Sequence, residues 1–347
     1  AARRNPLVRL APDRSALVNA DRTRTERVFV NGRPATSYEQ AAYDRVWDRL
    51  EQVVAPALAG PDRTLAEAMH PMQNDPWSGM VALWEGAIIA GADADVLGLQ
   101  DWHRNGLEGP NLLPQEGVGG LVQRLLAQPV ELGTRVTRLD WGGQGVVAET
   151  NRGTLRAAAA IVTVSTGVLA SGAIRFDPEL PASVQAAVRA LPMGLLTKIA
   201  LAGPGPGGLG IEQDGMLVDR DGRMTFNAWP QGRPYISGFV GGRLAWSVAE
   251  DPVAAEALAR AELARMLGGA AGLGGGAVVT RWGTDPLHLG AYAYAGPGDA
   301  DQRGVLAMAF PGERLLFAGE ACRMDGLAGT VGGAFLSGEE AADRLIS

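Results

Sequence analysis

The first residue with a chemical signal is Lys198. The chain has 31 basic residues, and Lys198 is the only lysine among them. An ammonium group is compact and can lose its proton on burial, whereas a guanidinium group keeps its charge. A single lysine in a chain that otherwise uses arginine therefore indicates a position where arginine cannot serve. Composition alone leaves the other interpretation open, which is a surface lysine without a function.

A second chemical signal lies near the C-terminus. Residues 315–318 predict a short buried strand that ends at Gly319, where the backbone can approach a ligand closely. Glu320 follows, and its carboxylate can accept hydrogen bonds from ligand hydroxyl groups. A helix is predicted to begin between Gly329 and Val331, with free N–H groups that favour negative charge. This order of elements indicates a nucleotide site, and the alternative is a glycine-rich packing turn.

The C-terminal pattern resembles the flavin motif of the flavin-dependent amine oxidase family, which includes monoamine oxidases, polyamine oxidases and flavin-dependent histone demethylases. The resemblance rests on LLFAGEA at residues 315–321, followed by AGTVGGAFLSGE at residues 328–339. Residues 161–169 look like the family's strand that leaves the flavin domain. Residues 193–199 are similar to the segment whose lysine many members hold near flavin N5 through a water molecule. Composition and resemblance thus both point to Lys198.

The resemblance implies FAD as the cofactor and assigns residues to it. The implied cofactor-binding residues are Val136, Gly319, Glu320, Gly329, Thr330 and Val331. Val136 lies in a segment that resembles the strand whose valine backbone meets adenine, although burial in a sheet explains a valine equally well. Ala291 stands where monoamine oxidases carry the cysteine that is linked to flavin. The resemblance therefore implies non-covalent FAD.

On the substrate side, RWGTDP at residues 281–286 and GAYAY at residues 290–294 resemble the family's active-site aromatic stretch. The implied substrate-binding residues are Trp282, Tyr292, Tyr294 and Thr330, with Tyr292 and Thr330 as opposite walls. An amine between aromatic faces gains cation–π attraction when it is protonated and apolar contact when it is neutral. Without the resemblance, core packing would be the preferred interpretation of these aromatic residues.

The resemblance implies an enzyme that oxidises a small-molecule amine, with Lys198 as its catalytic residue. Hydride would pass from the carbon beside the nitrogen to flavin N5, water would hydrolyse the resulting imine, and oxygen would reoxidise the flavin to release hydrogen peroxide. Two alternatives stay open. One is an FAD oxidoreductase acting on C–C bonds, of the carotenoid desaturase or protoporphyrinogen oxidase type. The other is a non-catalytic chain that keeps the fold to bind a partner.

Hydrophobic periodicity predicts the elements that must position these residues. The predicted helices are Tyr38–Leu58, Met80–Ile89, Gly117–Leu126, Ala182–Leu191, Pro252–Leu267 and Gly332–Ile346. The predicted strands are Leu132–Asp140, Gly145–Thr150, Arg156–Val164, Leu195–Leu201, Met216–Val218, Met224–Ala228, Tyr235–Val240, Ala277–Trp282 and Arg314–Ala318. The strands after residue 190 alternate with polar turns, which is typical of an antiparallel sheet.

We predict an α/β fold in which a partial Rossmann-like FAD-binding domain is interleaved with an α+β substrate domain. The substrate domain is expected to have a helical part at residues 26–113 and a sheet part at residues 173–309. The FAD-binding domain is expected to take residues 1–25, 114–172 and 310–347.

The family opens with a strand, a G-x-G-x-x-G loop and an acidic residue, and this opening is not found. Gly203, Gly205 and Gly208 have the spacing, but two prolines interrupt them and no helical pattern follows. Residues 5–7 resemble the segment just after the family's motif. The chain is then expected to begin inside the FAD-binding domain and to hold FAD poorly by itself. As given, it would be an enzyme or an inactive fragment of one.

Composition argues against several other classes. The net charge is −7 and no basic stripe is present, which argues against a nucleic-acid partner. No apolar run reaches the roughly 18 residues of a membrane span, so a soluble protein is expected, either cytoplasmic or exported. His70, His103 and His288 lack ligand spacing, so no metal site is predicted. The patterns do not determine the oligomeric state, and a homodimer stays open.

Overall fold

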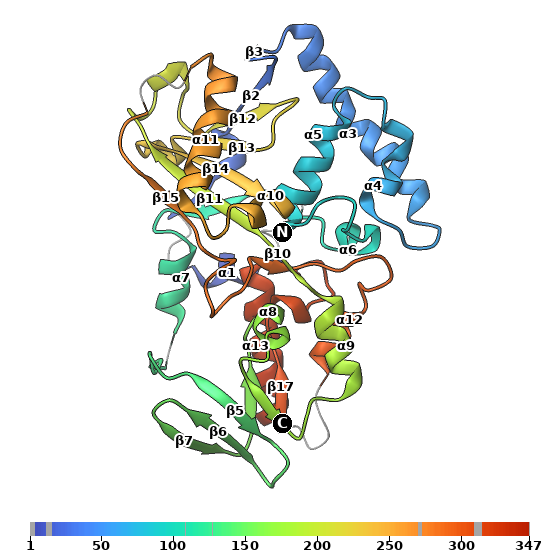
Figure 1. Ribbon diagram of the computed structural model, residues 1–347, viewed down its shortest axis with the longest axis vertical. Coiled ribbons are helices and arrows are strands. Elements are labelled where there is room, and N and C mark those ends of the chain that lie inside the picture. The colour runs from blue at the N-terminus through green and yellow to red at the C-terminus, as the bar shows by residue number, and fades with distance from the viewer. Residues whose placement is uncertain are drawn as a thin grey trace.

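The computed structural model describes residues 4–11, 16–107, 109–126, 128–269, 273–308 and 314–346. Two lobes are stacked along the long axis of the molecule (Figure 1). The upper lobe contains blue, cyan, yellow and orange segments, whereas the lower lobe contains green and red ones, so the chain passes between the lobes several times. Both lobes mix helices with strands. The predicted α/β class is confirmed.

A seven-stranded sheet forms the centre of the upper lobe. Its spatial order is β15 (Ala277–Val279), β11 (Leu196–Ala202), β14 (Tyr235–Gly241), β13 (Thr225–Ala228), β12 (Gly215–Asp219), β2 (Thr25–Val30) and β3 (Arg33–Pro34). Only β12 and β2 pair in parallel, and every other neighbouring pair is antiparallel. Burial alternates along β11, so each strand has one side chain row on each face of the sheet.

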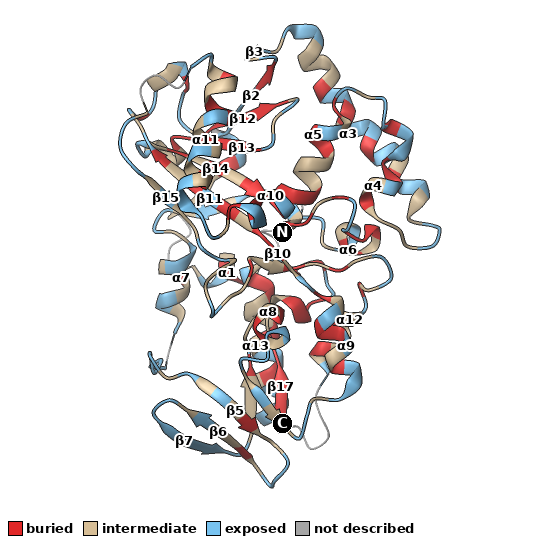
Figure 2. Cartoon of the chain, in the orientation of Figure 1, coloured by how far each residue is buried: buried red, intermediate tan, exposed pale blue. Residues whose placement is uncertain are grey.

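Helices cover both faces of this sheet. One apolar core joins β2 and β12 to helices that precede residue 105, and the other joins the opposite face to α10 (Gly242–Ser247) and α11 (Pro252–Leu267). The first set of helices is α3 (Ser37–Ala57), α4 (Leu65–Ala68), η2 (His70–Met72), α5 (Ser78–Ala82), the π-helical η3 (Leu83–Ala90) and α6 (Leu99–Arg104). The buried side chains of α3 recur three to four positions apart, at Tyr43, Val46, Leu50 and Val54. Figure 2 shows both buried layers in red.

The lower lobe has a small parallel pair at its centre. β17 (Leu315–Phe317) pairs in parallel with β8 (Ala160–Val162). One side of this pair packs on α9 (Ala182–Ala190) and α12 (Gln302–Ala307), and the other side packs on α13 (Val331–Ile346). A four-stranded sheet lies beside it, in the order β7 (Gly153–Ala157), β6 (Val146–Thr150), β5 (Val136–Asp140) and β9 (Arg175–Asp177).

Short elements connect the lobes. β10 (Met193–Gly194) pairs with β16 (Tyr292–Ala293), and β1 (Leu17–Asn19) pairs with β4 (Leu112–Pro114). The remaining elements are α1 (Pro6–Leu10), α2 (Ala20–Thr23), α7 (Val118–Leu125), α8 (Thr166–Ala170), η4 (Gly208–Gly210), η5 (Pro230–Gly232) and η6 (Glu320–Cys322). A side chain at Gly241 would begin 1.6 Å from the Ala87 carbonyl oxygen, so glycine is what lets η3 pack directly on β14.

Two sequence predictions about elements need correction, and several strands, among them β2 and β3, were not predicted. The single buried strand predicted at residues 156–164 is two strands: exposed β7, which pairs only with β6, and partly buried β8, which pairs with β17. The helix predicted at residues 80–89 is α5 followed by the π-helical η3. The expected domain boundaries at 173 and 309 stay predictions; α9 and α12, which fall between them, lie in the lower lobe (Figure 1).

None of the described helices is both long enough and apolar enough to cross a membrane. Within the same ranges, His, Cys, Asp and Glu side chains form no group of three or more that could hold a metal ion.

Candidate active site

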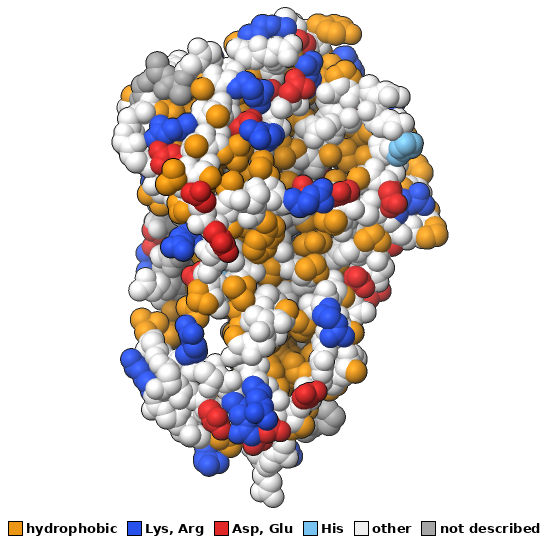
Figure 3. Space-filling view, in the orientation of Figure 1, with side chains coloured by type: hydrophobic (Ala, Val, Ile, Leu, Met, Phe, Trp, Pro, Cys, Tyr) orange, Lys and Arg blue, Asp and Glu red, His pale blue; other side chains and the backbone are white. Residues whose placement is uncertain are grey.

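Several of the predicted site residues meet where the two lobes join. Tyr292 lies on β16, between the end of η3 and the turn that precedes α13. Its hydroxyl is 3.5 Å from the Ile88 carbonyl oxygen, and its ring is 4.0 Å from the point where a side chain would begin at Gly329. Burial and the nearby charge of Glu320 raise the pKa of the Tyr292 phenol, which therefore stays neutral. Figure 3 shows hydrophobic side chains gathered along the middle of this face, where the lobes join.

Glu320 lies shortly after the end of β17 and beside the segment that carries Tyr292. The chain leaves the buried strand at Gly319, whose φ of 150° favours glycine, and Glu320 begins the short helix η6. One carboxylate oxygen accepts the Ala293 N–H and the other accepts the Gly329 N–H, both at 2.9 Å. Burial raises the pKa of this carboxyl group, and the Arg303 guanidinium opposes that rise. The contact of Glu320 with cofactor hydroxyl groups stays a prediction.

Thr330 caps the helix whose N-terminus was predicted to face a flavin. Its hydroxyl accepts the Gly333 N–H at 2.9 Å and donates to the Leu327 carbonyl oxygen at 2.7 Å. A side chain at Gly333 would begin 2.1 Å from the same carbonyl oxygen, so the tight turn requires glycine. Val331 is 47% exposed at the first turn of this 16-residue helix. The helix therefore presents its positive end at the lobe junction.

Lys198 is exposed on β11, which lies between β15 and β14 in the seven-stranded sheet. Its Nζ lies 5.7 Å from the centre of the Phe239 ring, the residue opposite it on β14. Its backbone N–H donates to the Thr280 hydroxyl at 2.9 Å. Thr225 is the residue opposite Phe239 on the next strand, and its buried hydroxyl has no hydrogen-bond partner among the described residues. Lys198 thus belongs to a row of side chains that crosses three strands.

The other predicted residues make different contacts. Trp282 is 41% exposed, and its ring meets the His288 ring edge-on at 4.7 Å between centroids. Tyr294 packs against the helical core of the upper lobe. Val136 is half-buried at the start of β5 in the lower lobe. The structure thus brings together Tyr292, Glu320, Gly329 and Thr330, next to Gly319 and Val331.

Sequence reasoning missed Asp101 and Arg303, which adjoin the same cluster. The Arg303 Nε and Nη2 atoms donate to the two Asp101 carboxylate oxygens at 2.8 and 3.0 Å. The two residues are 202 positions apart, so no local spacing relates them. An aspartate and an arginine are also ordinary surface residues in a sequence. We find no sequence signal that would have identified this pair.

The residues at the junction fit one end of a flavin cofactor. The end of a buried strand, an acidic side chain and a helix N-terminus converge there. Among the described residues, the N–H groups of Val331 and Gly332 have no hydrogen-bond acceptor, and such groups favour a negatively polarised ligand atom.

Comparison with known proteins also indicates a flavin-containing family. The profile of the family described as "Flavin containing amine oxidoreductase" matches residues 56–346. "Polyamine oxidase 4" of Oryza sativa subsp. japonica is 34% identical over 264 residues, which cover 73% of this chain and 53% of that protein. "Lysine-specific histone demethylase 1 homolog 1" of the same organism is 28% identical and covers 99% of this chain and 44% of that protein. The chain thus spans about half the length of these relatives.

A solved structure of a putrescine oxidase double mutant with redesigned cofactor binding superimposes with a TM-score of 0.74. The alignment covers 97% of this chain and 87% of that one at 17% identity, which supports the fold. The predicted family resemblance is confirmed by the profile and by these relatives. The prediction of FAD as the cofactor is confirmed at the level of the family, whose members contain a flavin.

Proposed function

This chain belongs to the flavin containing amine oxidoreductase family, and from that premise we propose that it oxidises an amine to an imine with FAD and passes the electrons to oxygen. The proposal is carried by one observation: Tyr292, Glu320 and the N-terminus of α13 converge at the junction of the lobes. The names of the polyamine oxidase relatives favour a small aliphatic amine as the substrate. Hydrogen peroxide is the expected product of the oxygen reaction.

A bound flavin supplies the acceptor for the hydride that leaves the carbon next to the amine nitrogen. Glu320 and Gly319 would hold the cofactor from the end of β17, and Gly329, Thr330 and Val331 would face it from the start of α13. Val136 would contact the adenine end. Ala291 has no side chain that could form a bond to the flavin, so binding would be non-covalent.

The protein's own residues would orient the amine and exclude water. The neutral, half-buried Tyr292 would form an apolar wall against which the neutral amine lies. Thr330 would form the opposite wall through its methyl group, because its hydroxyl is used to cap α13. Trp282 and Tyr294 would contribute to the substrate side from outside the cluster. By its resemblance to the family's lysine, Lys198 would hold a water molecule close to the reacting atoms.

The test is to purify the protein, record the flavin absorbance spectrum, and measure peroxide release with a panel of mono-, di- and polyamines. We expect this chain to bind FAD weakly, so FAD is supplied in excess, and we expect peroxide release with at least one amine. A flavoprotein that releases no peroxide with any amine but desaturates a C–C substrate would contradict the reaction. A protein without flavin, even after incubation with FAD, would contradict the cofactor.

A further inference from the structure

The segment that carries Tyr292 is held by charged side chains. On one side, Tyr292 and Ala293 pair with strand β10. The Ala293 N–H donates to Glu320, the Ala293 carbonyl oxygen accepts from Arg303 at 3.0 Å, and the Ala295 N–H donates to Asp101 at 2.8 Å. The hydrogen bonds that a neighbouring strand would make are therefore made by three ionisable side chains.

These three side chains form one buried chain of charges. Arg303 and Asp101 are paired by two hydrogen bonds, and their side chains are 3% and 5% exposed. The third guanidinium nitrogen, Nη1, has no hydrogen-bond partner among the described residues and lies 4.0 Å from a carboxylate oxygen of Glu320. Asp101 is on α6 in the upper lobe and Arg303 is on α12 in the lower lobe, so the chain of charges crosses the junction (Figure 1).

The planar guanidinium group is suited to this place. Its Nε and Nη2 match the two oxygens of Asp101, and Nη2 also reaches the Ala293 carbonyl oxygen. A lysine could carry the charge but could not make the paired hydrogen bonds. A buried charge pair is weak evidence for net stability, and its paired hydrogen bonds fix the two side chains relative to each other.

We propose that Arg303 is a positioning residue that fixes the Tyr292 wall to Glu320 and thereby couples the substrate side of the junction to its cofactor side. The assignment of one side to the substrate and the other to the cofactor rests on the proposed function. The coupling between the two sides does not depend on it. Arg303 makes two separable contributions. Its fork places the Tyr292 segment, and its charge opposes the rise in the Glu320 pKa that burial causes.

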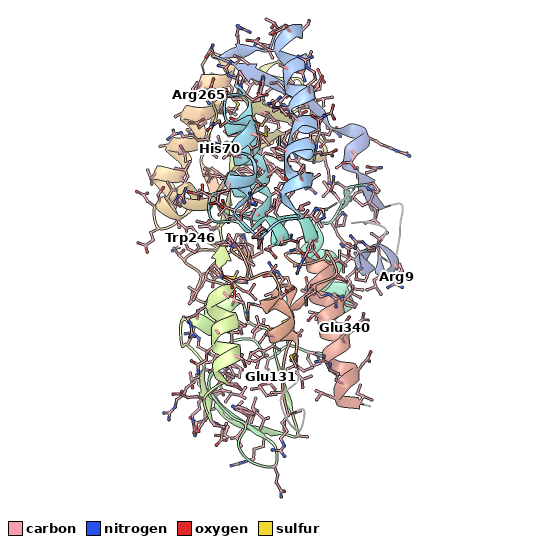
Figure 4. All side chains as sticks on the ribbon, turned by 90° about the vertical axis from the view of Figure 1, so that its right-hand side faces the viewer. Arg9, His70, Glu131, Trp246, Arg265 and Glu340 are labelled. Atoms are coloured by element: carbon pink, nitrogen blue, oxygen red, sulfur yellow. The ribbon has the colours of Figure 1, made fainter. Side chains whose placement is uncertain are left out.

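The first experiment needs no cofactor. Amide hydrogen exchange is measured by mass spectrometry on peptides that cover residues 290–296, in the wild type, Arg303→Lys and Arg303→Met. Both variants lose the fork, so we expect exchange about tenfold faster or more at the Ala293 and Ala295 amides. The control is Arg265→Met on α11 (Figure 4), which removes ion pairs with the buried carboxyl of Asp219 on β12 and with Glu262, away from residues 290–296. Exchange at residues 290–296 should stay at the wild-type rate in this control.

The second experiment measures FAD dissociation as a function of pH. It separates the effect of the Arg303 charge from the effect of its hydrogen-bond geometry. The groups that face Glu320 are Arg303, Asp101, Tyr292 and Cys322. Burial raises the pKa of Cys322 to about 12 and that of Tyr292 as well, so both stay neutral at the pH values of the assay. Without the arginine charge, Glu320 takes up a proton at higher pH and loses acceptor capacity. We expect Arg303→Met to release FAD at a higher pH than the wild type, and Arg303→Lys to follow the wild type.

The amine KM completes the test. Loss of the fork should raise KM about tenfold or more in both variants, because displacements of about 1 Å are costly at a reacting site. If Arg303→Met does not fold, the double variant Asp101→Asn/Arg303→Met removes both buried charges and is measured instead. Wild-type exchange at residues 290–296 in the Met variant, or equal acceleration in Arg265→Met, would overturn the coupling. Absence of FAD binding and of peroxide from the wild type would overturn the proposed function, while the exchange result would still decide the coupling.

Discussion

Replacing Glu320 by glutamine tests the cofactor side of the site most directly. An ionised carboxylate has about four acceptor positions. Two of them are used by the N–H groups of Ala293 and Gly329. The remaining positions are the ones predicted to accept cofactor hydroxyl groups. Glutamine keeps the shape of the side chain but removes the negative charge, so hydrogen bonds from cofactor hydroxyl groups are no longer charge-assisted. Its NH2 group would also face the N–H of Ala293 or Gly329, which then loses its acceptor.

A hydrogen bond to a charged group contributes about 1.5–3 kcal/mol. Since about 1.4 kcal/mol corresponds to a factor of ten, the dissociation constant for FAD should rise about 10- to 150-fold. The assay is equilibrium binding of FAD, followed by turnover at saturating FAD. Turnover should change much less than affinity, because the predicted role of Glu320 is to hold the cofactor.

The matched control is Glu340→Gln on α13, whose carboxylate pairs with Arg323 but is 66% exposed (Figure 4). An exposed ion pair contributes about 0–1 kcal/mol, so FAD affinity should change by less than about fivefold. The reasoning about Glu320 would be refuted by the opposite pattern, in which Glu320→Gln binds FAD normally but turns over slowly at saturation. Glu320 would then take part in the reaction itself.

Three further predictions concern the other residues of the site. Lys198→Met should leave anaerobic reduction of the flavin by amine largely intact in stopped-flow measurements but slow reoxidation by oxygen, and Lys198→Arg should resemble Met because arginine is not a compact donor; reoxidation of the Arg variant at the wild-type rate would contradict this. Tyr292→Phe should keep the amine KM, since the ring forms the wall, whereas Tyr292→Ala should raise KM by about tenfold or more; equal KM values for both variants would exclude Tyr292 as a wall. Thr330→Val should lower the free energy of unfolding by about 1 kcal/mol through loss of the cap on α13, and Thr330→Ser should not; denaturant unfolding of both variants decides this.

Local signals explain why much of the fold could be predicted from the sequence. α11 was predicted with the bounds that it has, because Asp251 caps its first turn, Pro252 opens it and Gly268 closes it in a left-handed conformation. β11, β12, β13 and β14 were found within about two residues because polar turns separate them. β2 and β3 of the same sheet were not predicted, and β15 ends three residues before the predicted end. β17 and α13 were found for the same reason, and they position Glu320 and Thr330.

The errors arose where local signals were ambiguous. Residues 156–164 contain a long apolar run, but a change of direction divides it, so that β7 ends at Ala157 and β8 begins at Ala160 in a different sheet. The apolar run from residue 83 to 90 is compatible with any buried helix, and the sequence carries no mark of its π-helical turns. Both errors concern backbone hydrogen bonding that only the assembled core determines.

The buried pair of Asp101 and Arg303 could not be predicted from the sequence at all. Either residue alone would be placed at the surface, because burying one unpaired charge costs several kcal/mol. Their burial becomes acceptable only when α6 and α12 meet across the lobe junction and the two side chains pair. Gly98 at the start of α6 permits that meeting, since a side chain there would begin 2.6 Å from the Gly296 carbonyl oxygen. The Tyr292 wall therefore depends on contacts from both lobes, and a sequence pattern within either lobe cannot reveal it.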